Sequence, residues 1–409
     1  MAYTPVNVNK DCTLREKFTR EEIISAYRTG RNYTGAAEIL SAKGVGEVSR
    51  QLARHWVLNL DSESETNDGP SLAAQSIRAR NQQINNNALR KEIRELHRHI
   101  EITDATMGAI DSACAVLSKR PPLPLSPPSK TSGKRCTAEL LLSDLQIGKL
   151  GANYNTKVAR ARLFEFGRAA RRQIEQKMQV NYRIERIVLA LLGDLIESDK
   201  KHKNSARATD SGTAEQMHNA IVGIFELVLE PLASLGIPID VICITGNHDH
   251  DDHGLTMWKP GREQFSWPMY HSLAKCAKYA GLHHVQFHIP EGAFKVIDIY
   301  GQKVLYEHGV GVSVNESSMR AHKVKRSEQI QDHITYFRMG DKHNVSTFNS
   351  GQYVVNGAFF GASGSGIEYS EIAGYSSIPA QWLGFHVPRK DCRFTLYDSF
   401  TIQLDHITE

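Results

Sequence analysis

Polar residues suited to metal chemistry follow several short apolar runs in the second half of this 409-residue chain. Residues 241–244 (Val-Ile-Cys-Ile) lead through Thr-Gly into Asn247, His248 and Asp249. An apolar run followed by glycine is typical of a buried parallel strand that ends at the edge of a sheet, where open α/β folds bind their ligands. We therefore expect an active site at this turn.

Four further apolar runs end in the same way. Residues 138–143 lead into Asp144 and Gln146, residues 186–192 into Asp194, residues 303–307 into His308, and residues 334–339 into Asp341 and His343. Carboxylate, amide and imidazole groups are ligands for hard or borderline divalent cations. A bridging carboxylate among such ligands is the composition that a two-metal phosphoryl-transfer site requires.

The order of these clusters resembles the signature of the calcineurin-like metallophosphoesterase superfamily. That signature is Asp-x-His, Gly-Asp-x-x-(Asp/Glu), Gly-Asn-His-(Asp/Glu), a later His, and Gly-His-x-His, and the resemblance covers roughly residues 136–343. It implies that Asp144 and His343 hold a first metal ion, that Asn247 and His308 hold a second, and that Asp194 bridges the two. It also implies that His248 protonates the leaving oxygen or stabilises the transition state without binding a metal, and Asp249 is placed to orient its imidazole.

Two positions depart from the family pattern. Gln146 stands where the first His is expected, and Asp341 stands where the first His of the last motif is expected. Asp341 is an acceptable oxygen ligand, whereas Gln146 is a weaker, neutral one. Oxygen ligands favour a hard ion over zinc. The expected cofactors are therefore two divalent metal ions, Mn²⁺ first, with Mg²⁺ as the alternative.

Residues 1–62 are expected to form a small all-α domain. Thr19 and Glu22 have the spacing of a capping box, and apolar residues at helical spacing predict three short helices. With a glycine-containing turn before the third helix, this arrangement resembles a helix-turn-helix module. Arg50, Gln51 and Arg54 lie opposite the apolar stripe of the third helix, where they could contact DNA. The alternative is a docking or dimerisation bundle whose exposed arginines are simply solvated.

Residues 72–120 have the pattern of one long helix. One heptad position is occupied by residues 86, 93, 100, 107 and 114, and the other by residues 89, 96, 103, 110 and 117. This seam predicts a coiled coil that joins copies of the chain into a homodimer or higher homo-oligomer. The alternative is a single helix laid against the catalytic domain. The proline-rich residues 121–135 predict a semi-rigid linker.

Residues 136–409 are predicted to form an α/β metallophosphoesterase domain, a two-sheet sandwich flanked by helices. After Asp194 comes a basic loop that could bind a phosphate backbone, or could be a solvated run of charge. Its cations are Lys200, Lys201, Lys203 and Arg207. A second basic patch, residues 320–326, is expected as a wall of the cleft or as a solvated helix face.

Composition limits the other possibilities. A formal net charge of +4 is too small to indicate nucleic-acid binding by itself. Six scattered cysteines without Cys-x-x-Cys spacing fit a reducing cytoplasm. No apolar run reaches the roughly 18 residues that a membrane span needs, and the N-terminal residues lack the pattern of a signal peptide. We therefore expect a cytoplasmic protein with no membrane partner.

The attached segments favour DNA as the substrate. The layout resembles the nuclease branch of the superfamily, which includes the catalytic subunit of the SbcCD complex, and in particular its phage-encoded relatives, which would act in the cytoplasm of the bacterial host. We therefore expect a hydrolase, a divalent-metal-dependent DNA phosphodiesterase with endo- or exonuclease action, whose partner ATPase, if any, the sequence does not identify. The alternatives are a phosphatase or nucleotide phosphodiesterase, and a DNA-binding protein with a degenerate metal site.

Overall fold

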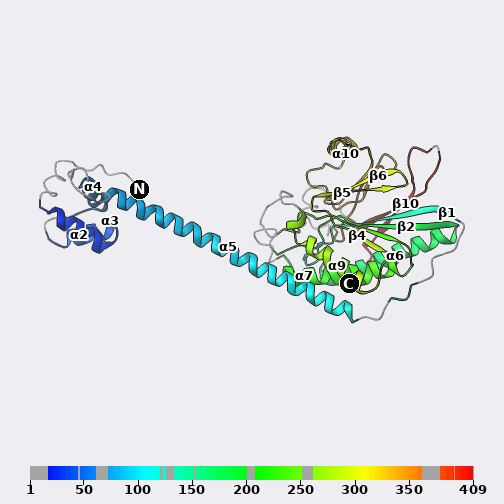
Figure 1. Cartoon of the computed structure of the whole chain (residues 1–409), viewed down its shortest axis with the longest axis horizontal. Coiled ribbons are helices and arrows are strands. Elements are labelled where there is room, and N and C mark those ends of the chain that lie inside the picture. Colours follow the sequence, from blue (N-terminus) through cyan, green and yellow to red (C-terminus); the bar gives the residue numbers. More distant parts are fainter. Residues whose placement is uncertain are drawn as a thin grey trace. The chain divides into compact units, whose positions relative to one another are not determined.

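The computed structural model describes residues 17–44, 47–60, 72–119, 123–125, 133–151, 153–199, 208–250, 261–361, 378–390 and 392–408 (Figure 1). The chain divides into two compact units between Glu101 and Ile102. Among the described helices, none combines the length and the apolarity that crossing a membrane would require.

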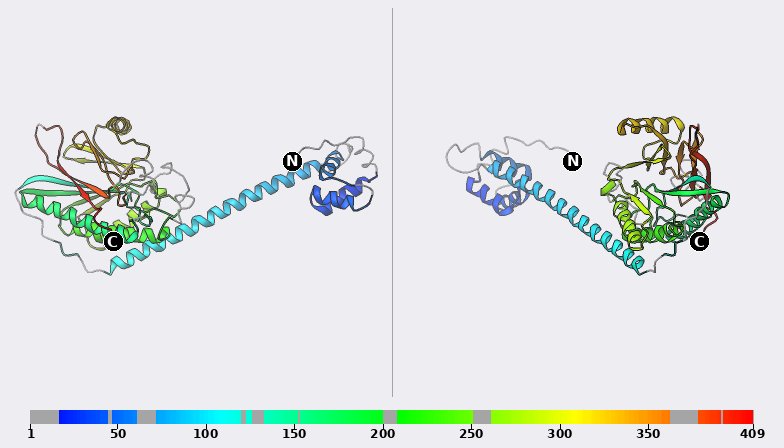
Figure 2. Two further views of the ribbon diagram at one scale, coloured as in Figure 1. Left: turned by 180° about the vertical axis from the view of Figure 1, so that it is seen from behind. Right: turned by 45° about the vertical axis from the view of Figure 1, so that its right-hand side comes forward.

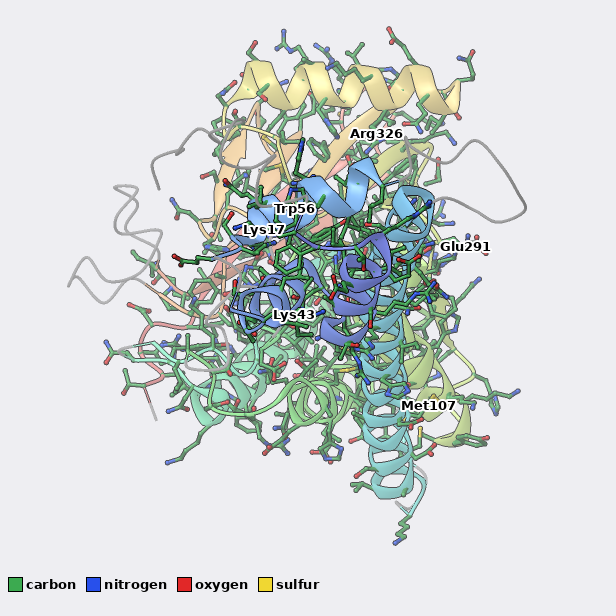
Figure 3. All side chains as sticks on the ribbon, turned by 90° about the vertical axis from the view of Figure 1, so that its left-hand side faces the viewer. Lys17, Lys43, Trp56, Met107, Glu291 and Arg326 are labelled. Carbon is green, nitrogen blue, oxygen red and sulfur yellow. The ribbon has the colours of Figure 1, made fainter. Side chains whose placement is uncertain are left out.

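Three short helices and the beginning of a long one make up the first unit. They are α2 (Arg20–Gly30), α3 (Tyr33–Ser41), α4 (Arg50–Asn59) and α5 (Leu72–Ser118). The predicted capping box is present, because Thr19 accepts from the backbone of Glu22 while the Glu22 carboxylate accepts from the backbone of Thr19. Apolar side chains from all three short helices, Trp56 of α4 among them, form one core (Figure 3). The three predicted helices are therefore present, and their role in binding DNA stays a prediction.

Helix α5 is one uninterrupted helix of 47 residues, as its sequence predicts. The boundary between the two units falls within it. Beyond that boundary Ala109 is buried, and Ile110 and Cys114 pack against the core of the second unit. The seam residues Leu89 and Ile93 are 53% and 51% exposed. The C-terminal part of the seam therefore packs on the catalytic domain, as the second alternative expected, whereas Leu89 and Ile93 are about half exposed.

The second unit is built on two mixed sheets. The first has the order β11-β10-β1-β2-β3-β4. The last four strands are parallel to one another, β10 is antiparallel to β1, and β11 is antiparallel to β10. Its strands are β1 (Lys134–Leu142), β2 (Tyr182–Leu191), β3 (Ile239–Cys243), β4 (Val285–His288), β10 (Ala380–His386) and β11 (Leu396–Gln403).

The second sheet has the order β5-β6-β7-β9-β8, and its three central strands are parallel. Its strands are β5 (Phe294–Ile299), β6 (Gln302–Glu307), β7 (Ile334–Met339), β8 (Ser346–Phe348) and β9 (Tyr353–Val355). The central strands of both sheets are nearly continuous apolar runs because both of their faces are covered.

Successive side chains of a strand point to opposite faces, and the two cores follow this alternation. Leu140 and Leu142 of β1 face the helices on the outer side of the first sheet, and Leu141 faces the second sheet. The outer helical elements are α6 (Thr156–Gln179), α7 (Thr213–Ile224), the π-helix η2 (Phe225–Leu229), α8 (Glu230–Ala233), the short η3 (Gly261–Glu263) and α9 (Ser266–Tyr279) (Figure 2). Helix α10 (Glu316–Ile330) packs on the outer face of the second sheet. The predicted α/β architecture with two sheets and flanking helices is confirmed.

A charged cluster lies in the apolar space between the sheets. Glu139 is fully buried and accepts from Arg338, from the Tyr306 hydroxyl at 2.7 Å and from Nε2 of His386 at 2.9 Å. Burial alone would raise the pKa of Glu139, but Arg338 and His386 hold that pKa at about 2. The cluster joins β1, β6, β7 and β10 and so fixes how the two sheets pack.

Candidate metal centre

The polar loops predicted from the sequence meet at one edge of the sandwich. They follow the C-terminal ends of β1, β2, β3, β6 and β7. The first two remain paired beyond their strands, since the backbone N–H of Asp144 donates to Gly193 at 3.1 Å and that of Gln146 donates to Asp194 at 2.9 Å. Parallel strands bring their carboxyl ends to the same edge of a sheet, so the loops after β1, β2 and β3 meet at an edge of the first sheet and those after β6 and β7 at an edge of the second. The packing of the two sheets brings these two edges together.

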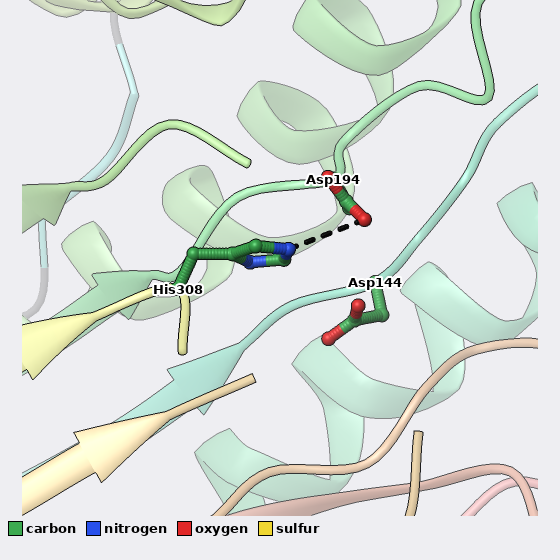
Figure 4. Close-up of side chains that lie close together, drawn as sticks. All are labelled: Asp144, Asp194 and His308. Atoms are coloured by element: carbon green, nitrogen blue, oxygen red, sulfur yellow. Dashed lines mark ion pairs between the residues drawn. The ribbon is translucent and has the colours of Figure 1, made fainter. Parts of the chain in front are cut away.

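Asp144, Asp194 and His308 form the centre of this edge (Figure 4). One ligand atom from each lies within 4.8 Å of the others, and all three side chains are buried. Nε2 of His308 is 3.3 Å from Oδ2 of Asp194. On the other side of the ring, Nδ1 is 2.6 Å from the carbonyl oxygen of Leu192, so Nδ1 is the donor. Burial opposes a second proton on the ring, but the charges of Asp194 and Asp144 raise the pKa of His308 well above its ordinary value. A metal ion in place of that proton would take the lone pair of Nε2.

That lone pair faces oxygen atoms that can only accept. Oδ1 of Asn247 is 2.8 Å from Nε2 of His308, and the carboxylate of Asp194 is nearly as close. Acceptors that face one another need either a proton or a cation between them. A histidine whose Nδ1 donates to a backbone carbonyl while Nε2 points at carboxylate and amide oxygens has the orientation of a metal ligand.

The remaining predicted ligands fall into two groups beside Asp194. Oδ1 of Asp341 is 3.7 Å from Nε2 of His308, which places Asp341 with the second predicted ion. Nε2 of His343 is 3.5 Å from Oδ1 of Asp144, which places His343 with the first. The structure thus places these predicted ligands at one edge, where the backbone N–H of Asp341 also donates to Oδ2 of Asp144 at 3.1 Å. Which ion each residue would hold stays a prediction.

Gln146 supports a metal site in a different way. Both polar atoms of its amide are buried, and among the described residues neither has a hydrogen-bond partner; the same holds for Oδ1 of Asp144. Buried polar groups are nearly always hydrogen-bonded, so these orphaned oxygen atoms need an explanation. A divalent ion would supply it, and the residues present therefore fit a metal centre.

The electrostatics agree with this fit. Burial, together with the charge of Asp194, raises the pKa of Asp144 to about 7. Burial also opposes ionisation of Asp194, but His308 and His248 hold its pKa well below the ordinary value. Burial lowers the pKa of His343 to about 4, which leaves the ring neutral and available as a ligand. A cation between the two carboxylates would stabilise both of them in the charged form.

Backbone strain concentrates at the predicted ligands. Asp144, Gln146, Asp194, Asp341 and His343 have φ angles of 53°, 41°, 52°, 64° and 58°. Residues other than glycine rarely adopt this left-handed conformation, and such strain gathers at functional sites. The conformation turns each ligand out of its strand toward the common edge.

Two glycines leave the space that the carboxylates of Asp194 and Asp144 occupy. A Cβ atom on Gly246 would lie 2.0 Å from Oδ1 of Asp194, and one on Gly340 would lie 2.7 Å from Oδ2 of Asp144. Both distances are too short for any side chain. These glycines are therefore required by the close approach of the loops.

His248 is positioned by Glu197, which corrects one sequence prediction. Nδ1 of His248 is 3.3 Å from the backbone carbonyl oxygen of the buried Glu197 and also 3.3 Å from its Oε2, and the backbone N–H of His248 donates to Oδ1 of Asp194 at 2.7 Å. Asp249, which was expected to orient the imidazole, instead accepts from the backbone N–H groups of Gly246 at 2.7 Å and Asp194 at 3.3 Å. The reason is that Asp249 turns inward at the end of β3 and holds two ligand loops together.

Two residues at this edge had no role in the sequence interpretation. One is Glu197, which is the acidic position of the Gly-Asp-x-x-(Asp/Glu) motif. The other is Lys149, whose Nζ is 4.8 Å from the ring centroid of Phe360, itself 4.7 Å from the ring of His343. The charge of Lys149 acts on both Glu197 and His343. Its place five residues after Asp144 in the same loop is the signal that could have identified it.

The predicted DNA contacts are described only in part. Arg50, Gln51 and Arg54 are exposed on α4, opposite its buried residues. Lys200, Lys201, Lys203 and Arg207 lie outside the described residues.

No family model matches the sequence, and no curated protein matches it. Among solved structures, the chain is similar to zinc-complexed Vps29 of Entamoeba histolytica, with 11% identity over 65% of this chain and 99% of that one and a TM-score of 0.26. A predicted phosphoesterase of Streptococcus pneumoniae has 8% identity over 66% and 98% of the two chains and a TM-score of 0.25. A purple acid phosphatase of yellow lupin has 13% identity over 68% and 55% and a TM-score of 0.24. Similarities this low carry no weight for function, which rests on the geometry of the site.

Proposed function

We propose that this chain is a metal-dependent phosphoesterase of the calcineurin-like type and that it cleaves phosphodiester bonds in DNA. The observation that carries the first part is the cluster of Asp144, Asp194 and His308, with its orphaned oxygens and its strained ligand loops. Asp144, Gln146 and His343 would hold one divalent ion, and Asn247, His308 and Asp341 the other, with Asp194 between them. Predominantly oxygen ligands favour Mn²⁺ or Mg²⁺.

When bound, two such ions stabilise charge on the phosphoryl oxygens and lower the pKa of the attacking water. The chain supplies the other functions. The backbone N–H of His248 donates to the Asp194 carboxylate, which places the imidazole beside the metal site. From there the imidazole can donate a proton to the departing oxygen. The carbonyl oxygen and the carboxylate of Glu197 both lie at the Nδ1 side of the imidazole and orient the ring. Lys149 adds a positive charge at the rim that favours an anionic substrate.

DNA is proposed as the substrate because of the first unit. Three exposed donors on α4 sit on a helix that follows two others, the arrangement in which a recognition helix enters a groove. Arginine and glutamine side chains at such positions bind phosphates and base edges.

Plasmid cleavage tests the proposal. Wild type should cut linear or circular plasmid DNA with Mn²⁺ or Mg²⁺ but not with EDTA, and circular DNA distinguishes endonuclease from exonuclease action. Asp194→Ala should lose both metal and activity, whereas His248→Ala should keep the metal and lose activity. Turnover of p-nitrophenyl phosphate or cyclic nucleotides without cleavage of DNA would replace the nuclease with a phosphatase or nucleotide phosphodiesterase. Less than stoichiometric metal after loading would contradict an active metal centre.

We also propose that the chain self-associates through α5. Leu89, Ile93 and Met107 belong to the heptad seam and are 53%, 51% and 51% exposed (Figure 3). Half-exposed apolar side chains at heptad spacing are stabilised when a second helix of the same spacing covers them, and another copy of α5 has that spacing.

A further inference from the structure

A second polar pocket lies in the catalytic unit, away from the metal centre. Its volume is about 940 Å³, which is in the range of pockets that hold small molecules. The starts of β6, β7 and β9 line it through Gln302, Ile334 and Tyr353, and α10 forms a wall. Because these three strands are parallel and the predicted metal ligands follow the opposite ends of β6 and β7, the pocket lies roughly one strand length of 20 Å from the metal centre.

Three cations line this pocket: Arg320 and Lys323 of α10, and Arg393. Arg320 pairs with Glu316. Within the described part of the chain, no carboxylate lies within 4.0 Å of the charged groups of Lys323 or Arg393. From the sequence, residues 320–326 were expected as a wall of the cleft or as a solvated helix face. In the structure, His322 and Arg326 pair with Glu307, whereas Lys323 lines the pocket.

Lys323 is the informative residue. It is only 7% exposed, and its Nζ donates to the carbonyl oxygen of Thr335 at 3.3 Å and lies 5.2 Å from the ring centroid of Tyr353. The carbonyl and the aromatic ring can engage at most two of the three N–H donors of this group. Burial lowers the pKa of Lys323, and Arg320 and Arg393 lower it further. Burying an ammonium group without a counter-charge is costly, so an anion bound beside Lys323 would stabilise its charged form.

The pocket holds these cations in fixed places. The backbone carbonyl of Arg393 accepts from the Gln302 side chain at 2.8 Å, which ties the loop before β11 to the start of β6. Two of the lining residues are acidic, but Asp332 pairs with Lys303, and Glu328 is exposed at the mouth. Of the three cations, Lys323 is buried, whereas Arg320 and Arg393 are exposed.

We propose that this pocket binds a small phosphorylated molecule, whose phosphate group lies between Lys323 and Arg393 and extends toward Arg320. A charge-assisted contact from each cation fits a phosphate dianion, and the concave shape suits a small ligand better than a nucleic-acid backbone. The site is independent of the proposed phosphoesterase activity.

Calorimetric titration of the full chain with inorganic phosphate tests this, at fixed ionic strength and with EDTA present so that the metal centre does not contribute. Wild type should bind phosphate, Lys323→Met should bind at least about tenfold more weakly, and the exposed Arg393→Gln should weaken binding without affecting folding. Lys325→Met, at an exposed position of the same helix outside the pocket, should bind like wild type.

Circular dichroism and thermal unfolding would show whether Lys323→Met folds; if it does not, Arg393→Gln decides. Absence of phosphate binding by wild type would overturn the proposal, as would unchanged affinity in Arg393→Gln and in a folded Lys323→Met. Displacement of bound phosphate by an oligonucleotide without terminal phosphates would also overturn it in favour of a nucleic-acid site.

Discussion

Oε2 of Glu197, in the loop after β2, lies 3.3 Å from Nδ1 of His248, in the loop after β3. Glu197 is only 5% exposed, and although burial opposes ionisation of its carboxylate, His248 keeps the pKa of Glu197 below the ordinary value. Glu197→Gln should therefore lower kcat by about one to two orders of magnitude, because a charged partner that orients and stabilises the imidazolium is lost. Steady-state kinetics together with metal analysis would check this, and the metal content should stay unchanged.

A double-mutant cycle separates this role from a general structural one. If Glu197 acts through the imidazole, Glu197→Gln should cost little more in the His248→Ala background. Equal and additive losses in the two backgrounds would contradict a positioning role for Glu197.

Gly246→Ala should abolish metal binding. The added Cβ would lie 2.0 Å from Oδ1 of Asp194, so the loop after β3 or the proposed bridging carboxylate must move. Metal content after loading with Mn²⁺, measured by mass spectrometry, should fall well below that of wild type. Gly292→Ala is the matched control, since nothing lies within 4 Å of its added Cβ. Full metal loading of Gly246→Ala would show that Asp194 is not a ligand.

Much of this site could be predicted from the sequence because short apolar runs fix both the strands and the points at which they end. The run 334–339 corresponds to β7, and Asp341 and His343 follow it as expected. In a parallel sheet, strand ends converge whatever the loops do, so the ligand set needs no detailed geometry.

The roles of Asp249 and Glu197 could not be predicted in the same way. Both acids lie close to a ligand in sequence, and which of them faces His248 depends on the direction in which each turn leaves its strand. Helix α5 shows a similar limit. A heptad pattern identifies an apolar seam but not what covers it, and in the structure Ala109 and Cys114 meet the catalytic unit while Leu89 and Ile93 stay half-exposed.

The buried ion pair of Glu139 and Arg338 predicts how stability depends on acid. The folded-state pKa of Glu139 is about 2, against an ordinary value of 4.5. A depressed pKa contributes stability above the unfolded-state value and loses it as pH falls toward the folded-state value. Between pH 4.5 and 2 the free energy of unfolding should therefore fall by about 3 kcal/mol through this residue.

Chemical unfolding at several pH values would measure this dependence. Glu139→Gln combined with Arg338→Met, which leaves no unpaired buried charge, should lack this part of it. Glu291→Gln removes an exposed glutamate that pairs with Arg262 and should unfold like wild type. An identical pH dependence in the double variant and wild type would contradict the assignment.

The exposed arginines of α4 make a prediction about DNA affinity. Arg50→Ala with Arg54→Ala should weaken DNA binding by about tenfold or more and should reduce the slope of log affinity against log salt by about 2, because two phosphate contacts are lost. Fluorescence anisotropy at several salt concentrations would measure both. Arg20→Ala with Arg28→Ala removes the same charge from exposed positions of α2 and should change affinity less. Equal losses in the two pairs would show that only net charge matters.

Self-association through α5 can be tested at its seam. Leu89→Glu with Ile93→Glu places like charges where apolar side chains of two helices are proposed to meet, so the dimer dissociation constant should rise by at least about a hundredfold. Analytical ultracentrifugation would measure this. Asn87→Glu with Ala88→Glu adds the same charge at exposed positions outside the seam and should leave assembly unchanged. A wild-type chain that is monomeric at micromolar concentration would instead show that the exposed seam is not a contact between copies.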